Sequence, residues 1–281
     1  MAHAQSLSCS WMSVLISLAL TLAACNAAQP TPMPTPVPKA NVAVSGSGSV
    51  ASTIKFLAEA YGKKHNDLSF EFLSGTGTGG GTKGVLQQQL DLAAMARVPT
   101  SEESAGGIAF VGFGIDKIAF VTSLDVSVAG LTSQQVKDIL TGKITNWSAV
   151  GGPNVTINVL VRDEADAATQ VLRDKLVGKE AFASSALVLT SAGDMNAALA
   201  NTTNALGFGS YTSMILDKAK ARALTVDGHA PADLNDNSYP FTRQIGVGYL
   251  PSNAKVKPFL DYIASPEAKT LLAGQGVVSA K

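Results

Sequence analysis

Hydrophobic residues along the chain follow two periods, and the change from one to the other recurs from residue 41 onward. Residues 41–45, "NVAVS", form a short β-rich run, and "GSGS" follows as a turn. Apolar residues then fall at helical spacing, at Ile54, Leu57 and Tyr61. Further strands are expected at 68–73, 90–96, 116–124 and 155–161. This alternation predicts an α/β fold with a mostly parallel sheet, whose ligand sites lie at the carboxyl ends of strands.

Residues 131–147, "LTSQQVKDILTGKITNW", predict a helix with both of its ends. Thr132 or Ser133 is the expected N-cap, and Gly142 is the expected stop. The apolar stripe between them consists of Val136, Ile139 and Leu140. This helix precedes the strand expected at 155–161.

The N-terminus has the pattern of an export signal. The apolar run from Val14 to Ala24 is shorter than the about 20 residues that a membrane-spanning helix needs. It ends in "LAAC", which resembles the bacterial lipobox, so we expect residues 1–25 to be a lipoprotein signal peptide with Cys25 lipidated. The start "MAHAQSLSCS" departs from this pattern because it has no Lys or Arg. A buried apolar segment that ends in Cys by chance is the alternative.

Residues 26–40 are rich in proline, which occupies nearly every second position of "PTPMPTPVP". Such a segment favours extended polyproline II, so we expect a semi-rigid linker before a folded part that begins near residue 41. Cys9 would leave with the signal peptide and Cys25 would carry lipid, so no disulfide is expected.

The charge of the chain is balanced, with 21 Lys plus Arg and 21 Asp plus Glu among 281 residues. A nucleic-acid partner or an anionic membrane surface would require an excess of basic residues, so neither is expected. An anion bound by this protein must therefore be held by local groups.

The stretch "SGTGTGGGTKG", residues 74–84, is the first candidate for such a site. Gly75, Gly77 and Gly80 match G-x-G-x-x-G, but the next strand ends without the carboxylate of a dinucleotide site, and no Gly-Lys-Ser/Thr follows Gly80. Backbone N–H groups and Thr hydroxyls at a strand end suit a small anion. A flexible hairpin without a ligand is the alternative.

Other chemistry is scarce in the sequence. The three histidines are isolated and no usable Cys remains, so no metal site or cofactor is expected. No G-x-S-x-G surrounds a serine, so an enzyme is possible but has no support.

Several blocks together resemble the phosphate-binding lipoproteins of phosphate ABC transporters, over nearly all of residues 41–281. These blocks are "SGSGSV", "GTGGGTKGVL", "LTSQQVKDILTGKITNWSAVGGPN", "INVLVRDE", "ALGFGSY", "NSYPFTR" and "FLDYIASPEAKTLLAGQG". The resemblance implies a two-lobed periplasmic-binding-protein-like fold of class II, with mixed sheets flanked by helices and a ligand cleft between the lobes. Lobe 1 would take residues 41–117 and 210–281, and lobe 2 residues 118–209.

The resemblance also implies a binding site for phosphate or a similar oxyanion. The family's first loop corresponds to Ser47, Gly48 and Ser49, and its second to Thr78 and Gly79. Arg162, at the end of the strand predicted at 155–161, matches the family arginine. In two places the sequence departs from the family: Ala96 replaces Asp or Ser, and Ala165-Asp166-Ala167-Ala168 replaces glycine-serine-glycine-threonine.

Asp166 has two interpretations. Its carboxylate could accept the proton of hydrogen phosphate in place of the acid missing at Ala96, or it could only cap the next helix, for which Asp163 is the other candidate. A salt bridge to a nearby acid is likewise the alternative to ligand contact for Arg162. Arg97 is a second possible cation, for which a surface role is favoured.

The expected protein is therefore a monomeric, extracytoplasmic, lipid-anchored binding protein that delivers phosphate to an ABC transporter permease. One rival is a degenerate binding-fold lipoprotein with another ligand or a sensing or adhesion role, for which the altered segment 165–168 is the best support. The other rival, an enzyme that uses the cleft, has the least support.

Overall fold

The computed structural model describes residues 39–278. The signal peptide, the lipidated Cys25 and nearly all of the proline-rich linker lie outside these residues and stay predictions. Within residues 39–278, no helix is long and apolar enough to cross a membrane.

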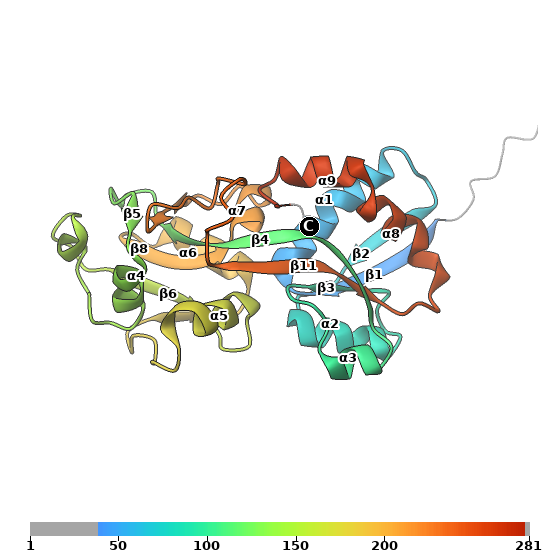
Figure 1. The fold of residues 1–281 in the computed structure, drawn as a ribbon, viewed down its shortest axis with the longest axis horizontal. Coiled ribbons are helices and arrows are strands. Elements are labelled where there is room, and N and C mark those ends of the chain that lie inside the picture. The colour runs from blue at the N-terminus through green and yellow to red at the C-terminus, as the bar shows by residue number, and fades with distance from the viewer. Residues whose placement is uncertain (1–38, 279–281) are drawn as a thin grey trace, which may run out of the picture. The chain divides into compact units, whose positions relative to one another are not determined.

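Nine strands of the described residues form one mixed sheet, shown in Figure 1. Its order is β2-β1-β3-β11-β4-β8-β6-β7, with β9 paired to β4. The strands are β1 (Ala40–Gly46), β2 (Leu68–Phe72), β3 (Leu92–Met95), β4 (Ala109–Thr122), β6 (Asn158–Arg162), β7 (Leu187–Leu189), β8 (Ala205–Ser210), β9 (Arg222–Ala223) and β11 (Thr242–Tyr249). A separate pair joins β5 (Gly130–Leu131) to β10 (Thr225–Val226).

Strand β4 connects the two halves of this sheet. Its first part pairs antiparallel with β11, which also pairs with β3, and its second part pairs antiparallel with β8. The outer pairs β1–β2, β1–β3, β6–β7 and β6–β8 are parallel. The sequence predicted a strand at 116–124, so it missed the first half of β4, where glycines interrupt the apolar run "AFVGFG".

Helices cover both faces of each half of the sheet (Figure 1). They are α1 (Gly48–Gly62), α2 (Gly77–Leu86), α3 (Ser101–Ala105), α4 (Ser133–Leu140), α5 (Ala167–Leu172), α6 (Ala192–Asn201), α7 (Tyr211–Leu216), α8 (Lys257–Ala264) and α9 (Pro266–Ala273). Short helical turns lie at Trp147–Val150, Arg173–Val177 and Ala254–Val256. The predicted two-lobed α/β class is confirmed.

Two hydrophobic cores mark the two lobes. The first lobe is built around the core that β1 and β3 share with α1, α8 and α9. The second lobe is built around the core that β6 and β8 share with α4 and α5. Leu224, Val226, Tyr239 and Phe241 pack in the second core, although the sequence assigned 210–281 to the first lobe. The exact lobe boundaries stay a prediction.

Several predicted helix ends are confirmed. Thr132 caps α4 in a capping box with Gln135, and Gly142 follows the helix with a φ of 80°. Strands at 41–45 and 68–73 and the helix after the first turn also appear, with α1 beginning at Gly48. Local sequence therefore predicted these elements well, because their caps and apolar periods agree.

The glycine-rich stretch is mostly helix rather than loop, because α2 already begins at Gly77. Gly46 has a φ of 130°, and a Cβ added to Gly81 would lie 2.8 Å from the Gly46 Cα. The helix thus packs backbone against backbone on the end of β1, which only glycine permits. Gly79, in contrast, has open space beside it, so its lack of a side chain keeps the nearby cavity open.

Candidate functional site

A cavity of about 260 Å³ lies where strand ends of the two lobes meet. From the first lobe, the start of α1 and the start of α2 line it; from the second lobe, the segments after β6 and β7 do. The lining includes Ser47, Gly48, Thr78, Arg162 and Asp166. Five predicted site residues are therefore brought together around one space. A liquid water occupies about 30 Å³, so the space has room for a small oxyanion.

A larger cavity of about 630 Å³ shares part of this lining. Thr78 lines both cavities, whereas the predicted residue Gly79 lines only the larger one. Ser49 lines neither, but it borders a third space of about 20 Å³ together with Arg162 and Asp166. The predicted residues thus surround three neighbouring cavities with overlapping linings.

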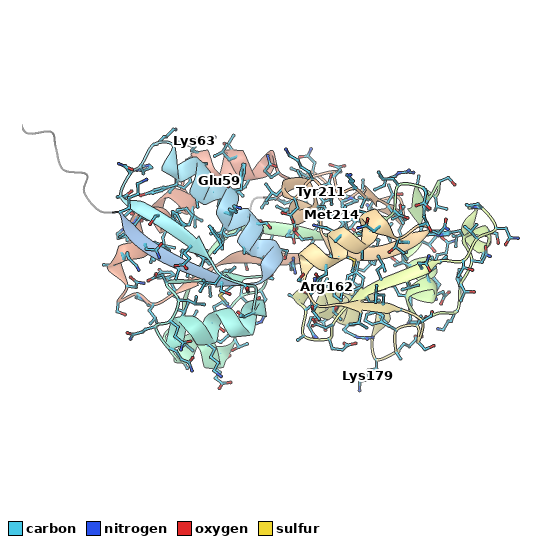
Figure 2. All side chains as sticks on the ribbon, turned by 180° about the vertical axis from the view of Figure 1, so that it is seen from behind. Glu59, Lys63, Arg162, Lys179, Tyr211 and Met214 are labelled. Carbon is cyan, nitrogen blue, oxygen red and sulfur yellow. The ribbon has the colours of Figure 1, made fainter. Side chains whose placement is uncertain are left out.

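Arg162 is buried and its guanidinium is only partly satisfied. It is the last residue of β6 and lies on the inner side of the second lobe, whereas Lys179 points outward (Figure 2). Its Nη2 donates to the Asp166 carboxylate at 2.7 Å and to the Thr190 carbonyl at 3.2 Å. Its Nε and Nη1 are buried and have no partner among the described residues. A buried donor without an acceptor is costly, so an oxyanion oxygen that supplied the missing acceptor would stabilise this guanidinium.

Asp166 has two structural roles: it caps α5 and it pairs with Arg162. One carboxylate oxygen accepts from the backbone N–H of Ala168 at 2.9 Å and so caps α5. The other accepts from Arg162 at 2.7 Å. The side chain remains 19% exposed and lines the 260 Å³ cavity, so a ligand could also reach this carboxylate.

The starts of α1 and α2 differ from most other helix starts in the described residues. Ser47 and Thr76 are the N-cap residues, and neither side chain makes a capping hydrogen bond. Side chains do cap α3, α4, α5, α6, α7 and α9. The first N–H groups of a helix have no acceptor within the helix, and its N-terminus carries partial positive charge. The two uncapped starts therefore offer donors to an anion in the cavity.

The predicted hydroxyl groups are buried beside these helix starts. Ser47 and Ser49 lie within hydrogen-bonding distance of each other, at 3.2 Å between their hydroxyl oxygens. The hydroxyl of Thr78 accepts from the backbone N–H of Ala96 at 3.0 Å. Since that oxygen already accepts a hydrogen bond, its proton remains available for donation to a ligand.

Arg97 has a partner already. Its guanidinium contacts Glu103 with two hydrogen bonds of 2.7 and 2.9 Å. These bonds are the main reason why the pKa of Glu103 falls to about 2, and a hydrogen bond from Thr82 contributes. Arg97 lines the larger cavity, but its two hydrogen bonds to Glu103 favour a structural role, in which Arg97 stabilises the start of α3.

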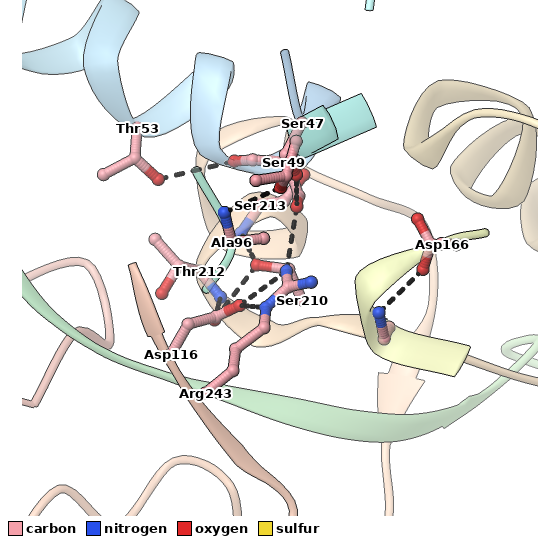
Figure 3. A network of polar contacts seen from close by, with 12 residues as sticks. Ser47, Ser49, Thr53, Ala96, Asp116, Asp166, Ser210, Thr212, Ser213 and Arg243 are labelled. Carbon is pink, nitrogen blue, oxygen red and sulfur yellow. Dashed lines mark hydrogen bonds and ion pairs between the residues drawn. The ribbon is translucent and has the colours of Figure 1, made fainter. Parts of the chain in front are cut away.

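Arg243 is the buried arginine that the sequence analysis did not single out. It lies on β11, and its Nε and Nη2 both donate to one oxygen of Asp116 on β4, at 3.0 and 2.9 Å (Figure 3). Its Nη2 also donates to the Ser49 hydroxyl at 2.8 Å. The only available signal was its place in the block "NSYPFTR", which marked the family and no role.

The side chains around the cavities differ from those of a metal centre. Within residues 39–278, no group of three or more His, Cys, Asp or Glu side chains could hold a metal ion. The cavity offers hydroxyl groups, backbone N–H groups and guanidinium groups instead, which are hydrogen-bond donors for an oxyanion.

Comparison with known proteins identifies the family of this chain. A family model described as the PBP superfamily domain matches residues 28–267. The chain belongs to the PBP superfamily. The phosphate-binding protein PstS of Borreliella burgdorferi is 25% identical over 253 residues, which cover 85% of this chain and 90% of the relative. The PstS of Bacillus subtilis is 23% identical over 245 residues, which cover 85% and 80%.

Solved structures of this superfamily are similar in fold. One is a Clostridium perfringens protein described as a phosphate ABC transporter substrate-binding protein and solved with bound phosphate, with 28% identity and a TM-score of 0.76. The match covers 86% of this chain and all of that one. An ABC-type phosphate transport receptor from Vibrio cholerae has 25% identity and a TM-score of 0.63, with 85% and 100% covered. The resemblance drawn from the sequence is thereby confirmed, and these relatives are named as binding proteins.

Proposed function

We propose that this superfamily member captures phosphate in the cavity between its lobes and delivers it to an ABC transporter permease. Arg162 carries the proposal, because two of its nitrogens are buried without a partner among the described residues beside two uncapped helix starts. An oxyanion would satisfy the guanidinium and the helix N–H groups together. Ser47, Gly48, Ser49, Thr78, Gly79, Arg162 and Asp166 are the proposed binding residues.

The proposal includes the location and state of the protein. Cleavage before Cys25 and lipidation of this residue would anchor a monomer outside the cytoplasm, and the proline-rich segment 26–40 would hold the binding domain away from the membrane. The names of the relatives support a binding protein rather than an enzyme. Binding and release of an anion by hydrogen bonds needs no covalent chemistry.

Asp166 is assigned a role in selecting the ligand. Its carboxylate lines the cavity and can accept the proton of hydrogen phosphate, which fully ionised sulfate does not carry. The same carboxylate, which pairs with Arg162, would also repel a dianion and could keep the cavity free of phosphate. This repulsion favours the rival, a binding-fold lipoprotein with another ligand or role.

Calorimetric titration of the purified full chain, stripped of ligand by unfolding and refolding, tests the function. Phosphate is expected to bind more tightly than sulfate at pH 7. Arg162→Ala should weaken phosphate binding by at least about 100-fold, because charge-assisted hydrogen bonds to a buried anion are lost. Arg222→Ala is the matched control, since Arg222 is exposed on β9 and lines none of the three cavities, and it should bind as the unaltered protein does.

Two other results would change the conclusion. If the unaltered chain binds neither anion and Asp166→Ser gains phosphate binding, then the carboxylate excludes phosphate and the rival function holds. If Arg162→Ala binds phosphate as tightly as the control, then the anion does not occupy this cavity.

A further inference from the structure

Arg243 has one nitrogen that its network leaves unused. A guanidinium has five N–H donors, and three of them are accounted for by Asp116 and Ser49. The two on Nη1 have no hydrogen-bond partner among the described residues. Nη1 is not fully buried, so it keeps contact with open space.

Arg243 lines the two cavities that adjoin the 260 Å³ cavity and share lining residues with it. Arg243 lines the 20 Å³ cavity together with Arg162 and Asp166, and it also lines the 630 Å³ cavity together with Thr78. In Figure 3 the free nitrogen lies on the side of the guanidinium away from Asp116, toward Asp166. Arg243 is the residue that these two cavities have in common.

We infer that Arg243 is a second anion-binding arginine, which donates from Nη1 to the phosphate that Arg162 also holds. This inference rests on the proposed function and adds a ligand-binding residue to it. Asp116 and Ser49 fix the other two nitrogens, so the guanidinium is oriented before the ligand arrives and loses little freedom on binding.

Arg243 and its partner Asp116 lie where the two lobes are joined. Arg243 lies on β11 and Asp116 on β4, the two strands that connect the lobes, whereas Ser49 belongs to the first turn of α1. An anion bound by both arginines would contact β6 of the second lobe and the connecting strand β11 together. Arg243 would thus link ligand binding directly to the strands that connect the lobes.

Phosphate titration of Arg243→Lys tests the inference. Lysine keeps the positive charge beside Asp116. Its single ammonium group, however, lacks the planar set of donors with which a guanidinium can contact Asp116, Ser49 and the anion at once. We expect a loss of phosphate affinity of about 10- to 100-fold, the range for one charge-assisted hydrogen bond. Arg222→Lys, the same replacement at an exposed position, should leave the affinity unchanged.

A crystal structure of the unaltered chain with phosphate separates ligand contact from a merely structural role. A phosphate oxygen within hydrogen-bonding distance of Nη1 supports the inference even if Arg243→Lys fails to fold. An anion with no contact to Nη1 overturns it, and so does an Arg243→Lys variant that binds as tightly as Arg222→Lys. The proposed function would survive either of those two results, provided that phosphate binding still depends on Arg162. If the unaltered chain binds no phosphate, then both proposals fail.

Discussion

Two buried arginines, Arg162 and Arg243, line the same 20 Å³ cavity, and each pairs with an aspartate, but the protein satisfies the two pairs to different degrees. Asp116 is 1% exposed and accepts hydrogen bonds from Arg243, Ser210 and the Thr212 backbone. Arg162, in contrast, donates through one nitrogen and leaves two without partners among the described residues. The first pair is nearly complete within the protein and joins its connecting strands, whereas the second is incomplete until a ligand binds.

The largest expected effect comes from breaking the more complete pair. Asp116→Ala would leave Arg243 buried without its counter-charge and remove the acceptor of the Ser210 hydroxyl. We expect a loss of about 3–5 kcal/mol in the free energy of unfolding, measured by urea titration without phosphate. Asp166→Ala is the comparison, with a smaller expected loss of about 2 kcal/mol, because the cap of α5 and the ion pair with Arg162 are both lost but the Asp166 side chain is 19% exposed. Equal losses in the two variants would contradict the distinction between the pairs.

A smaller effect on stability is expected at the ion pair of Arg97 and Glu103. Arg97 lines the larger cavity and donates two hydrogen bonds to Glu103. The pKa of Glu103 falls from 4.5 to about 2 in the folded protein, mainly because of Arg97. A lowered folded-state pKa means that the charged carboxylate stabilises the fold above about pH 4.5, and that this stabilisation is lost as the pH falls toward 2. It amounts to at most about 3 kcal/mol.

Glu103→Gln measures this contribution, because glutamine can keep the capping box of α3. The variant should unfold more easily at pH 7 by about 2 kcal/mol. Its stability should then depend less on pH between 4.5 and 2 than that of the unaltered protein. Glu102→Gln, a neutralised neighbour that is exposed in the same first turn, is the control. Identical acid profiles for the two variants would show that the Arg97 pair contributes nothing.

The sequence singled out both residues of the incomplete pair but neither residue of the complete one, and the reason is distance along the chain. Arg162 and Asp166 are four positions apart, so a strand end followed by a helix cap drew attention to both, and a salt bridge of Arg162 to a nearby acid was the alternative to ligand contact. Asp116 and Arg243 are 127 positions apart and meet only because β4 pairs antiparallel with β11. No local pattern reveals such a contact.

The glycine stretch shows the same limit in the backbone. Low helix propensity of glycine favoured a loop, yet α2 begins at Gly77. Close packing of Gly81 on Gly46 is a tertiary contact that outweighs the local preference. The sequence linked these glycines to close approach of an anion, which stays a prediction, whereas the close approach that the structure shows is to β1.

The smallest effect on stability, and the sharpest test of the incomplete pair, is expected from Asp166→Asn. Asparagine caps a helix about as well as aspartate, so the expected loss in the free energy of unfolding is only about 1 kcal/mol, from the weaker hydrogen bond to Arg162. The charge beside Arg162 is removed, however, and with it the carboxylate that would accept the proton of hydrogen phosphate.

Selectivity is therefore the quantity to measure for Asp166→Asn. We expect the ratio of sulfate Kd to phosphate Kd, measured by calorimetry at pH 7, to fall by about 10-fold, because a charge-assisted bond specific to the protonated anion is lost and a repulsion of sulfate is relieved. Asp163→Asn is the matched control, since Asp163 lines the same cavity but does not cap α5. An unchanged ratio in Asp166→Asn would mean that Asp166 only caps its helix and holds Arg162, and that the donors alone select the anion.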